Sequence, residues 1–161
     1  MKKLYIKQKV FKILDHYPIM DENQEEKYHV DQSIRWIGFR VDVTNAQREP
    51  VFYIEKEVFT FLPRYHVHFE GGGEYTIQGQ FAIFRTHLEI EGLDEQITLK
   101  GDIFDLDFQI YADDRLIGEI GREFFTWGDT YELAIHEPGY ELFIISLFLC
   151  ADQIRDDQKG N

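Results

Sequence analysis

The chain has a single cysteine, Cys150, among its 161 residues, so an intrachain disulfide is excluded. It also lacks a long hydrophobic run, because the longest, Leu142–Ala151, has ten residues and is interrupted only by Ser146. About twenty apolar residues are needed to cross a bilayer, so no transmembrane span is expected. Met1 to Phe11 carry lysines but no apolar h-region, which predicts no secretory signal and a cytoplasmic location.

Basic residues are scarce. The chain has 17 lysines and arginines against 30 aspartates and glutamates, a net charge of −13. A field of this sign repels DNA, RNA and anionic lipid surfaces at long range. We therefore expect no nucleic-acid partner.

Catalytic motifs are missing as well. The only serines are Ser33 and Ser146, and no Gly-x-Ser-x-Gly elbow or phosphate-binding glycine loop is present. Gly71–Gly73 has the composition of a turn between strands. Cys150 lies in the longest apolar run, where a thiol packs as a small hydrophobic group. The sequence predicts a protein that is not an enzyme and holds no cofactor.

What the chain does contain is material for one aromatic-rich core. Apolar residues make up 43% of it and aromatic residues 16%. A chain of this length buries roughly 70% of its unfolded surface. We expect a single domain over residues 1–161.

A repeat of strand pairs runs through the chain. Each unit has an apolar segment, such as 56–61 or 101–104, followed after a short connection by a second segment with its own anchor. The first aromatic or aliphatic residue of the second segment recurs about every 20 to 26 residues. These residues are Tyr17, Phe39, Tyr65, Leu88, Phe108 and Tyr131.

Within the units, apolar and polar residues alternate with the period of a half-buried strand. Tyr65, Val67 and Phe69 fall on one face, and His66, His68 and Glu70 on the other. Turn-forming residues separate the strands, at 21–23, 44–46, 71–73 and 113–114. Six units predict about twelve strands between residues 3 and 135. They connect as an antiparallel meander, because no connection is long enough for a crossover helix. A two-sheet sandwich remains the alternative at this point.

The pattern changes after Leu133, and residues 140–157 are predicted to form a helix. A helix that is hydrophobic on every side is surrounded on every side. A closed barrel of about twelve strands has a lumen near the width of one helix, about 10–12 Å. The sequence therefore predicts a mainly β protein, a closed antiparallel barrel around a central buried helix. The apolar residues of this helix are Leu142, Phe143, Ile144, Ile145, Leu147, Phe148, Leu149 and Ala151.

The repeated strand pairs, the segment Phe124–Leu133 and the apolar helix after it resemble the LURP-one-related family, in its bacterial YxjI-like branch. The resemblance covers essentially the whole chain. It implies the tubby C-terminal fold, which that family shares with tubby proteins and phospholipid scramblases. Scramblases carry an acidic, calcium-associated stretch before their final helix. Only Asp129 stands at the matching place, so calcium binding is not carried over.

Two acidic or histidine clusters are candidates for metal binding. His66 and His68 form a His-x-His pair on the outward face of a strand, where Glu70 is the one further ligand in the same segment. Such residues more often form a solvated strand face, so they are weak metal candidates. The aspartates of one hairpin unit do not match the spacing of an EF-hand loop; they are Asp102, Asp105, Asp107, Asp113 and Asp114.

Five lysines precede the first acid, Asp15, and are candidates for contact with a lipid headgroup; they are Lys2, Lys3, Lys7, Lys9 and Lys12. Charged outward positions also protect an edge strand from aggregation, and the net charge of the chain favours that interpretation.

Three hypotheses of function follow. The first is a non-catalytic binding or scaffold domain that contacts a protein partner. The second, by analogy with tubby proteins and scramblases, is a phospholipid- or phosphoinositide-associated protein that tethers to membranes through the lysines. The third is a metal protein or enzyme built on His66 and His68. The residues name neither the partner nor the oligomeric state.

Overall fold

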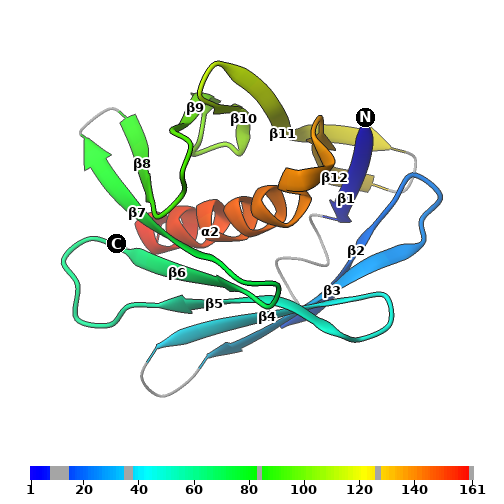
Figure 1. The fold of residues 1–161 in the computed structure, drawn as a ribbon, viewed down its shortest axis with the longest axis horizontal. Coiled ribbons are helices and arrows are strands. Elements are labelled where there is room, and N and C mark those ends of the chain that lie inside the picture. Colours follow the sequence, from blue (N-terminus) through cyan, green and yellow to red (C-terminus); the bar gives the residue numbers. More distant parts are fainter. Residues whose placement is uncertain (8–14, 35–37, 83–84, 126–127, 160–161) are drawn as a thin grey trace.

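One twelve-stranded antiparallel sheet wraps around a C-terminal helix in the computed structural model of the chain (Figure 1). The structure describes residues 1–7, 15–34, 38–82, 85–125 and 128–159. The strands are β1 (Lys2–Lys7), β2 (His16–Met20), β3 (Glu26–Ile34), β4 (Phe39–Asn45), β5 (Pro50–Lys56), β6 (Arg64–Phe69), β7 (Glu74–Ala82), β8 (Arg85–Glu91), β9 (Ile97–Asp102), β10 (Asp107–Ala112), β11 (Arg115–Phe125) and β12 (Gly128–Ile135).

The strand order is that of a meander whose two ends have been joined. Strands β1 to β8 follow one another in the sheet, as do β9 to β12, and β1 pairs with β12 along six residue pairs. Only β8 and β9 stand at the two ends of the order. The predicted barrel is confirmed, and the sandwich alternative is excluded. The barrel is nearly closed, because β8 and β9 are not hydrogen-bonded to each other in the described part of the chain.

Alternation along the strands matches the sequence pattern. On β6, Tyr65 and Val67 are fully buried, whereas His66 and His68 stay partly exposed. On β10, Phe108 and Ile110 alternate in the same way with exposed or half-buried neighbours. Strands β6 and β10 thus contribute every second residue to one core inside the barrel.

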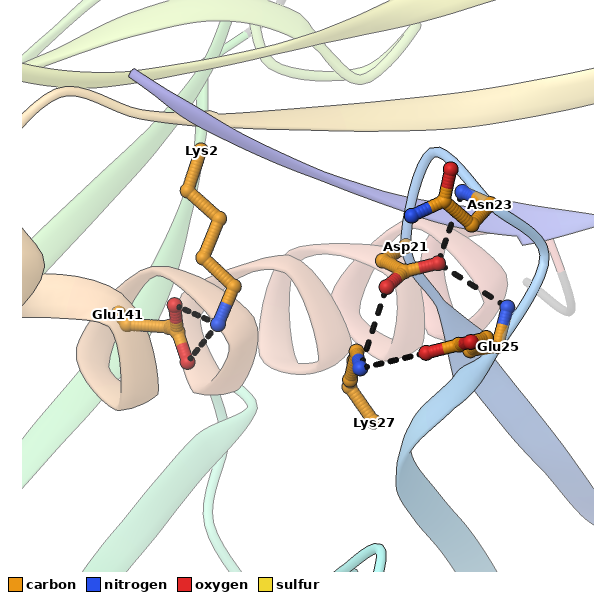
Figure 2. Close-up of polar contacts among 6 residues, drawn as sticks. All are labelled: Lys2, Asp21, Asn23, Glu25, Lys27 and Glu141. Atoms are coloured by element: carbon orange, nitrogen blue, oxygen red, sulfur yellow. Dashed lines mark hydrogen bonds and ion pairs between the residues drawn. The ribbon is translucent and has the colours of Figure 1, made fainter.

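Three of the four predicted turns, at 21–23, 71–73 and 113–114, lie between strands. The fourth is displaced, because β4 continues through Asn45 and the turn follows at 46–48. Asp21 shows how one turn is held. Its carboxylate accepts hydrogen bonds from the amides of Asn23, at 2.8 Å, and Glu25, at 3.0 Å. Lys27 Nζ lies 3.2 Å from the same carboxylate (Figure 2). The amide of Glu25, above all, lowers the pKa of Asp21. Aspartate side chains that accept hydrogen bonds from backbone amides of their own turn stabilise tight turns.

Two predicted strand segments are wrong in part. The repeat predicts strands over 56–61 and 101–104, whereas β5 ends at Lys56 and β9 ends at Asp102. Residues beyond these ends form connections, and Phe59 has a φ of 61°, which a continuing strand excludes. The periodicity failed here because the connections are as apolar as the strands that they follow.

After β12 the chain forms a short 3₁₀ turn, η1 (Pro138–Tyr140), and then the helix α2 (Glu141–Lys159). It starts one residue later and ends two residues later than predicted. Of the eight predicted core residues, Leu142 is only partly buried; the others, Phe143, Ile144, Ile145, Leu147, Phe148, Leu149 and Ala151, are buried. No helix in the described ranges has the length and apolarity that crossing a bilayer requires.

The barrel wall packs directly on α2. At Gly118 of β11, an added Cβ would lie 2.5 Å from Ile144 Cδ1, closer than real Cβ contacts allow. Aromatic residues fill the remaining space: the ring of Tyr131 lies 5.3 Å from that of Phe148, and the ring of Tyr75 lies 5.1 Å from that of Phe143. The interior is therefore a packed core.

Candidate binding surfaces

Several polar side chains of α2 form hydrogen bonds inside the barrel. Arg155 and Asp152, 2% and 4% exposed, form an ion pair one turn apart on α2, with Nη2 and Oδ1 2.5 Å from each other. Arg155 also donates to the hydroxyl of Tyr131 at 3.1 Å. Ser146 donates to the carbonyl of Phe143. Burial raises the pKa of the Cys150 thiol, so it stays protonated. These groups hold α2 in place and offer no reactive nucleophile.

Acidic residues attach both ends of α2 to the wall. At the first turn, Glu141 accepts a hydrogen bond from Tyr28 and forms an ion pair with Lys2, at 2.8 Å (Figure 2). Near the other end, Asp157 accepts hydrogen bonds from Tyr65 at 2.5 Å and Lys56 at 3.0 Å. Burial, and secondarily the carboxylate, raises the pKa of each tyrosine hydroxyl well above its usual value.

The two histidines do not converge on a common point. His66 Nε2 lies 2.8 Å from Glu57, and its Nδ1 lies 3.2 Å from Thr76 Oγ1. His68 stacks on Tyr53, with ring centroids 4.7 Å apart, and its Nδ1 lies 3.1 Å from Glu74. Each imidazole is thus engaged by its own neighbours, His66 by the loop residue Glu57 and by β7, and His68 by β5 and β7. Over the ranges that the structure describes, no group of three or more potential ligands gathers around a metal position.

The predicted lysines do not form a free basic edge where the structure describes them. Lys2 pairs with Glu141, and Lys3 lies 3.2 Å from Glu132. The hydrogen bond that Lys3 donates to Glu132 is the main cause that raises the pKa of Lys3. Lys7 is half-buried at the end of β1. Lys9 and Lys12 lie outside the described residues.

The aspartates of the fifth unit are split between two ends of the barrel. Asp102, Asp105 and Asp107 line a cleft of about 790 Å³ on β9–β12 together with Lys100 and Arg122. Asp113 and Asp114 occupy the turn at the other end of β10, where Asp113 accepts from the amide of Gln96. Asp102 likewise accepts a hydrogen bond from a backbone amide in its own turn, that of Asp105. These aspartates define no cation site.

A strongly exposed apolar surface lies on residues Glu57–Pro63, the connection between β5 and β6, which we call the aromatic loop. Phe59 is 96% exposed and Phe61 is 100% exposed, and Val58 beside them is exposed as well. The loop lies at the end of the barrel where α2 terminates (Figure 1). Together with Asp157 it lines a cleft of about 490 Å³. Sequence reasoning missed this surface. Pro63, the last residue of this loop, was the one available signal in the sequence that the strand does not continue.

The fold and these contacts define a class of protein: a nearly closed β-barrel whose core is a C-terminal helix. The sequence model of the LURP-one-related family matches residues 2–152. The chain therefore belongs to the LURP-one-related family. Part of the segment that carried the resemblance, residues 126–127, lies outside the described residues.

Two relatives extend this assignment. The chain is 25% identical over 154 residues to "Uncharacterized protein YxjI" of Bacillus subtilis, covering 96% of this chain and 94% of that one. It also resembles the X-ray structure of a protein from Arabidopsis thaliana, with a TM-score of 0.65 and 17% identity over 95% of this chain and 90% of that one. At that identity, the second likeness shows the fold alone.

Proposed function

We propose that this chain is a non-catalytic binding module that serves as a scaffold for a protein partner. The observation that carries this proposal is the exposure of Phe59 and Phe61 at the tip of one loop. Since α2 fills the interior, a partner has to meet the outer surface. The buried positions of Ser146 and Cys150 support a role without catalysis.

The aromatic loop carries two local costs that binding would offset. Burying two phenylalanine side chains stabilises a complex by about 3–6 kcal/mol in gross terms. Phe59 additionally holds a left-handed backbone conformation, with φ 61°, that is unfavourable for a bulky residue. Strained and solvent-exposed aromatic residues are concentrated at binding sites.

The double substitution Phe59→Ser/Phe61→Ser tests this proposal. Tagged protein is recovered from cells that express it naturally, and co-purified proteins are quantified by mass spectrometry. We expect at least one partner whose recovery falls tenfold or more, with an unchanged melting temperature. The matched control is Thr60→Ser in the same loop, which keeps both rings. Equal recovery of all partners by the double variant and the control would contradict the proposal.

Membrane contact is the second candidate, and the same loop favours it. Aromatic side chains insert at the interface of a bilayer, and the rings of Phe59 and Phe61 are almost fully exposed. The pairing of Lys2 and Lys3 with carboxylates argues against the N-terminal lysines as the headgroup contact. Lipid binding would therefore depend on Phe59 and Phe61.

Co-sedimentation with vesicles of phosphatidylcholine, with and without phosphoinositide, distinguishes the two lipid hypotheses. If the loop binds membranes, Phe59→Ser/Phe61→Ser abolishes sedimentation, and Lys2→Ala/Lys3→Ala leaves it unchanged. The reverse pattern, with strong salt dependence, would instead support the basic edge. No sedimentation of the unmodified chain at low salt would remove the lipid candidate.

A further inference from the structure

In the described sheet, β8 and β9 are consecutive strands that do not pair with each other at all, whereas β1 and β2 pair at one position, Tyr5 with Met20. All other consecutive strands pair, and β12 pairs with β1. A connection of five residues, Gly92–Gln96, joins the two unpaired edges. We call the space between these edges the seam. Residues of both strands line it, and it forms a cleft of about 680 Å³.

The backbone groups that face the seam on β8 follow from the register. The amide of Gly79 donates to Pro63, on the β6 side of β7. The backbone groups of Gln78 therefore face β8, where Glu89 lies opposite. Because these directions alternate along a strand, Leu88 and Ile90 direct their N–H and C=O groups into the seam.

The same reasoning applies to β9. The amide of Asp113 donates to the carbonyl of Gln96, so Gln96 and Thr98 bond toward β10. Ile97 and Leu99 then direct their backbone groups into the seam. Backbone N–H and C=O groups of β8 and of β9 thus border the cleft on its two sides. Neither set pairs with another strand in the described part of the chain. An unpaired edge is a template for a further strand.

The side chains of these residues give the seam an apolar floor. Leu88 is buried, and Ile90, Ile97 and Leu99 are partly buried against the core of the barrel. Leu93 of the connection packs on the same core. A strand bound here would cover this floor with every second side chain.

The outer rim of the seam is acidic. Glu89, Glu91 and Asp94 are exposed, and Glu95 lies 2.7 Å from Arg115. Lys100 is held 4.4 Å from the ring of Tyr111, so it does not neutralise the three exposed carboxylates. A strand that fits this seam therefore has apolar side chains on the face toward the floor and positive side chains on the opposite face, toward the acidic rim.

We propose that the seam binds an extended segment of a partner protein in which apolar residues alternate with lysine or arginine. The segment adds to the sheet as a further strand, with apolar side chains on the floor and basic side chains at the rim. One inserted strand needs about 4.8 Å on each side, and an extended five-residue connection spans more than that. This site is separate from the aromatic loop and does not depend on the proposed function.

Binding of a capped nonapeptide of alternating lysine and valine to the full chain, followed by calorimetry, tests the proposal. The reference peptide has the same charge, with its valines replaced by proline, which cannot donate to a strand edge. We expect the alternating peptide to bind at least tenfold more tightly than the reference. Equal affinities would overturn the proposal, because they would reflect charge alone.

Charge reversal at the rim separates local from long-range attraction. Glu89→Lys/Glu91→Lys is expected to weaken binding at least tenfold. The control, Glu22→Lys/Glu70→Lys, changes the net charge equally in turns that do not border the seam, and should change affinity less than twofold. Equal weakening by both pairs would overturn the proposal.

The strand edge itself is tested by Ile97→Pro against Ile97→Ala. Proline is tolerated at the first residue of a strand, and it removes the seam-facing amide. We expect Ile97→Pro to abolish binding, and Ile97→Ala to weaken it less than tenfold. Amide exchange of the unmodified chain gives an independent readout. Saturating peptide should slow exchange at Leu88, Ile90, Ile97 and Leu99 at least tenfold, and unchanged exchange there would overturn the proposal.

Discussion

Replacing Arg155 by methionine is expected to lower the free energy of unfolding by about 3–5 kcal/mol. Arg155 is 2% exposed and pairs with Asp152, which is 4% exposed. The substitution removes the cation that lies 2.5 Å from the buried carboxylate of Asp152, and it removes a donor to the hydroxyl of Tyr131. Urea unfolding followed by circular dichroism measures the loss. The total stability of a typical domain is about 5–15 kcal/mol, so this variant needs measurement at low temperature.

The matched control is the double variant Asp152→Leu/Arg155→Met. It removes the carboxylate together with the guanidinium, so no unpaired charge remains from this pair. We expect the double variant to be more stable than Arg155→Met alone. A single variant that costs less than about 1 kcal/mol would show that the pair is hydrated in solution.

Replacing Phe148 by alanine is expected to cost about 3–5 kcal/mol through the cavity that it leaves. Phe148 is fully buried on α2 and packs its ring 5.3 Å from that of Tyr131. The wall around it is a nearly closed hydrogen-bonded sheet, which limits how far the site can collapse. The denaturation midpoint should fall while the slope of the transition stays unchanged.

The same substitution at Phe61 provides the control, because this ring is 100% exposed. Phe61→Ala should change stability by no more than about 0.5 kcal/mol. Comparable losses for the two variants would mean that α2 does not form the core of the barrel. That result would contradict the architecture on which both proposals depend.

Several expectations from the residues lie beyond what the fold tests. The relation to tubby proteins, the cytoplasmic location and the absence of catalysis stay predictions. So does the extent of the domain over residues 1–161. Family membership itself is secure, because the match spans residues 2–152.

The local pattern was sufficient for most of the architecture. Alternation at Tyr65 and Val67 predicted strand and buried face together, because side chains on a strand point to opposite sides. The continuous apolar surface from Phe143 to Leu149 predicted a helix surrounded by sheet, because no polar stripe was available to face water. Both inferences depend on periods of two and 3.6 residues, which are visible within a few turns of chain.

The candidate binding surfaces could not be predicted from local sequence periodicity. Phe59 and Phe61 have the composition of a core strand, and only the end of β5 at Lys56 places them in water. Conversely, Lys2 and Lys3 have the composition of a basic patch, but carboxylates 139 and 129 positions away in the sequence neutralise them. Exposure and pairing are properties of distant neighbours, which periodicity does not contain.

The sequence by itself determined the strand faces, the turns and the helix that fills the barrel, because each follows from interactions between residues close in the chain. Only the tertiary structure decided where the barrel stays unpaired, between β8 and β9, and which apolar side chains remain outside it. Those features arise when twelve strands close around one helix. Whether β8 and β9 meet depends on the number, tilt and stagger of all twelve strands, and no single segment of the sequence determines these.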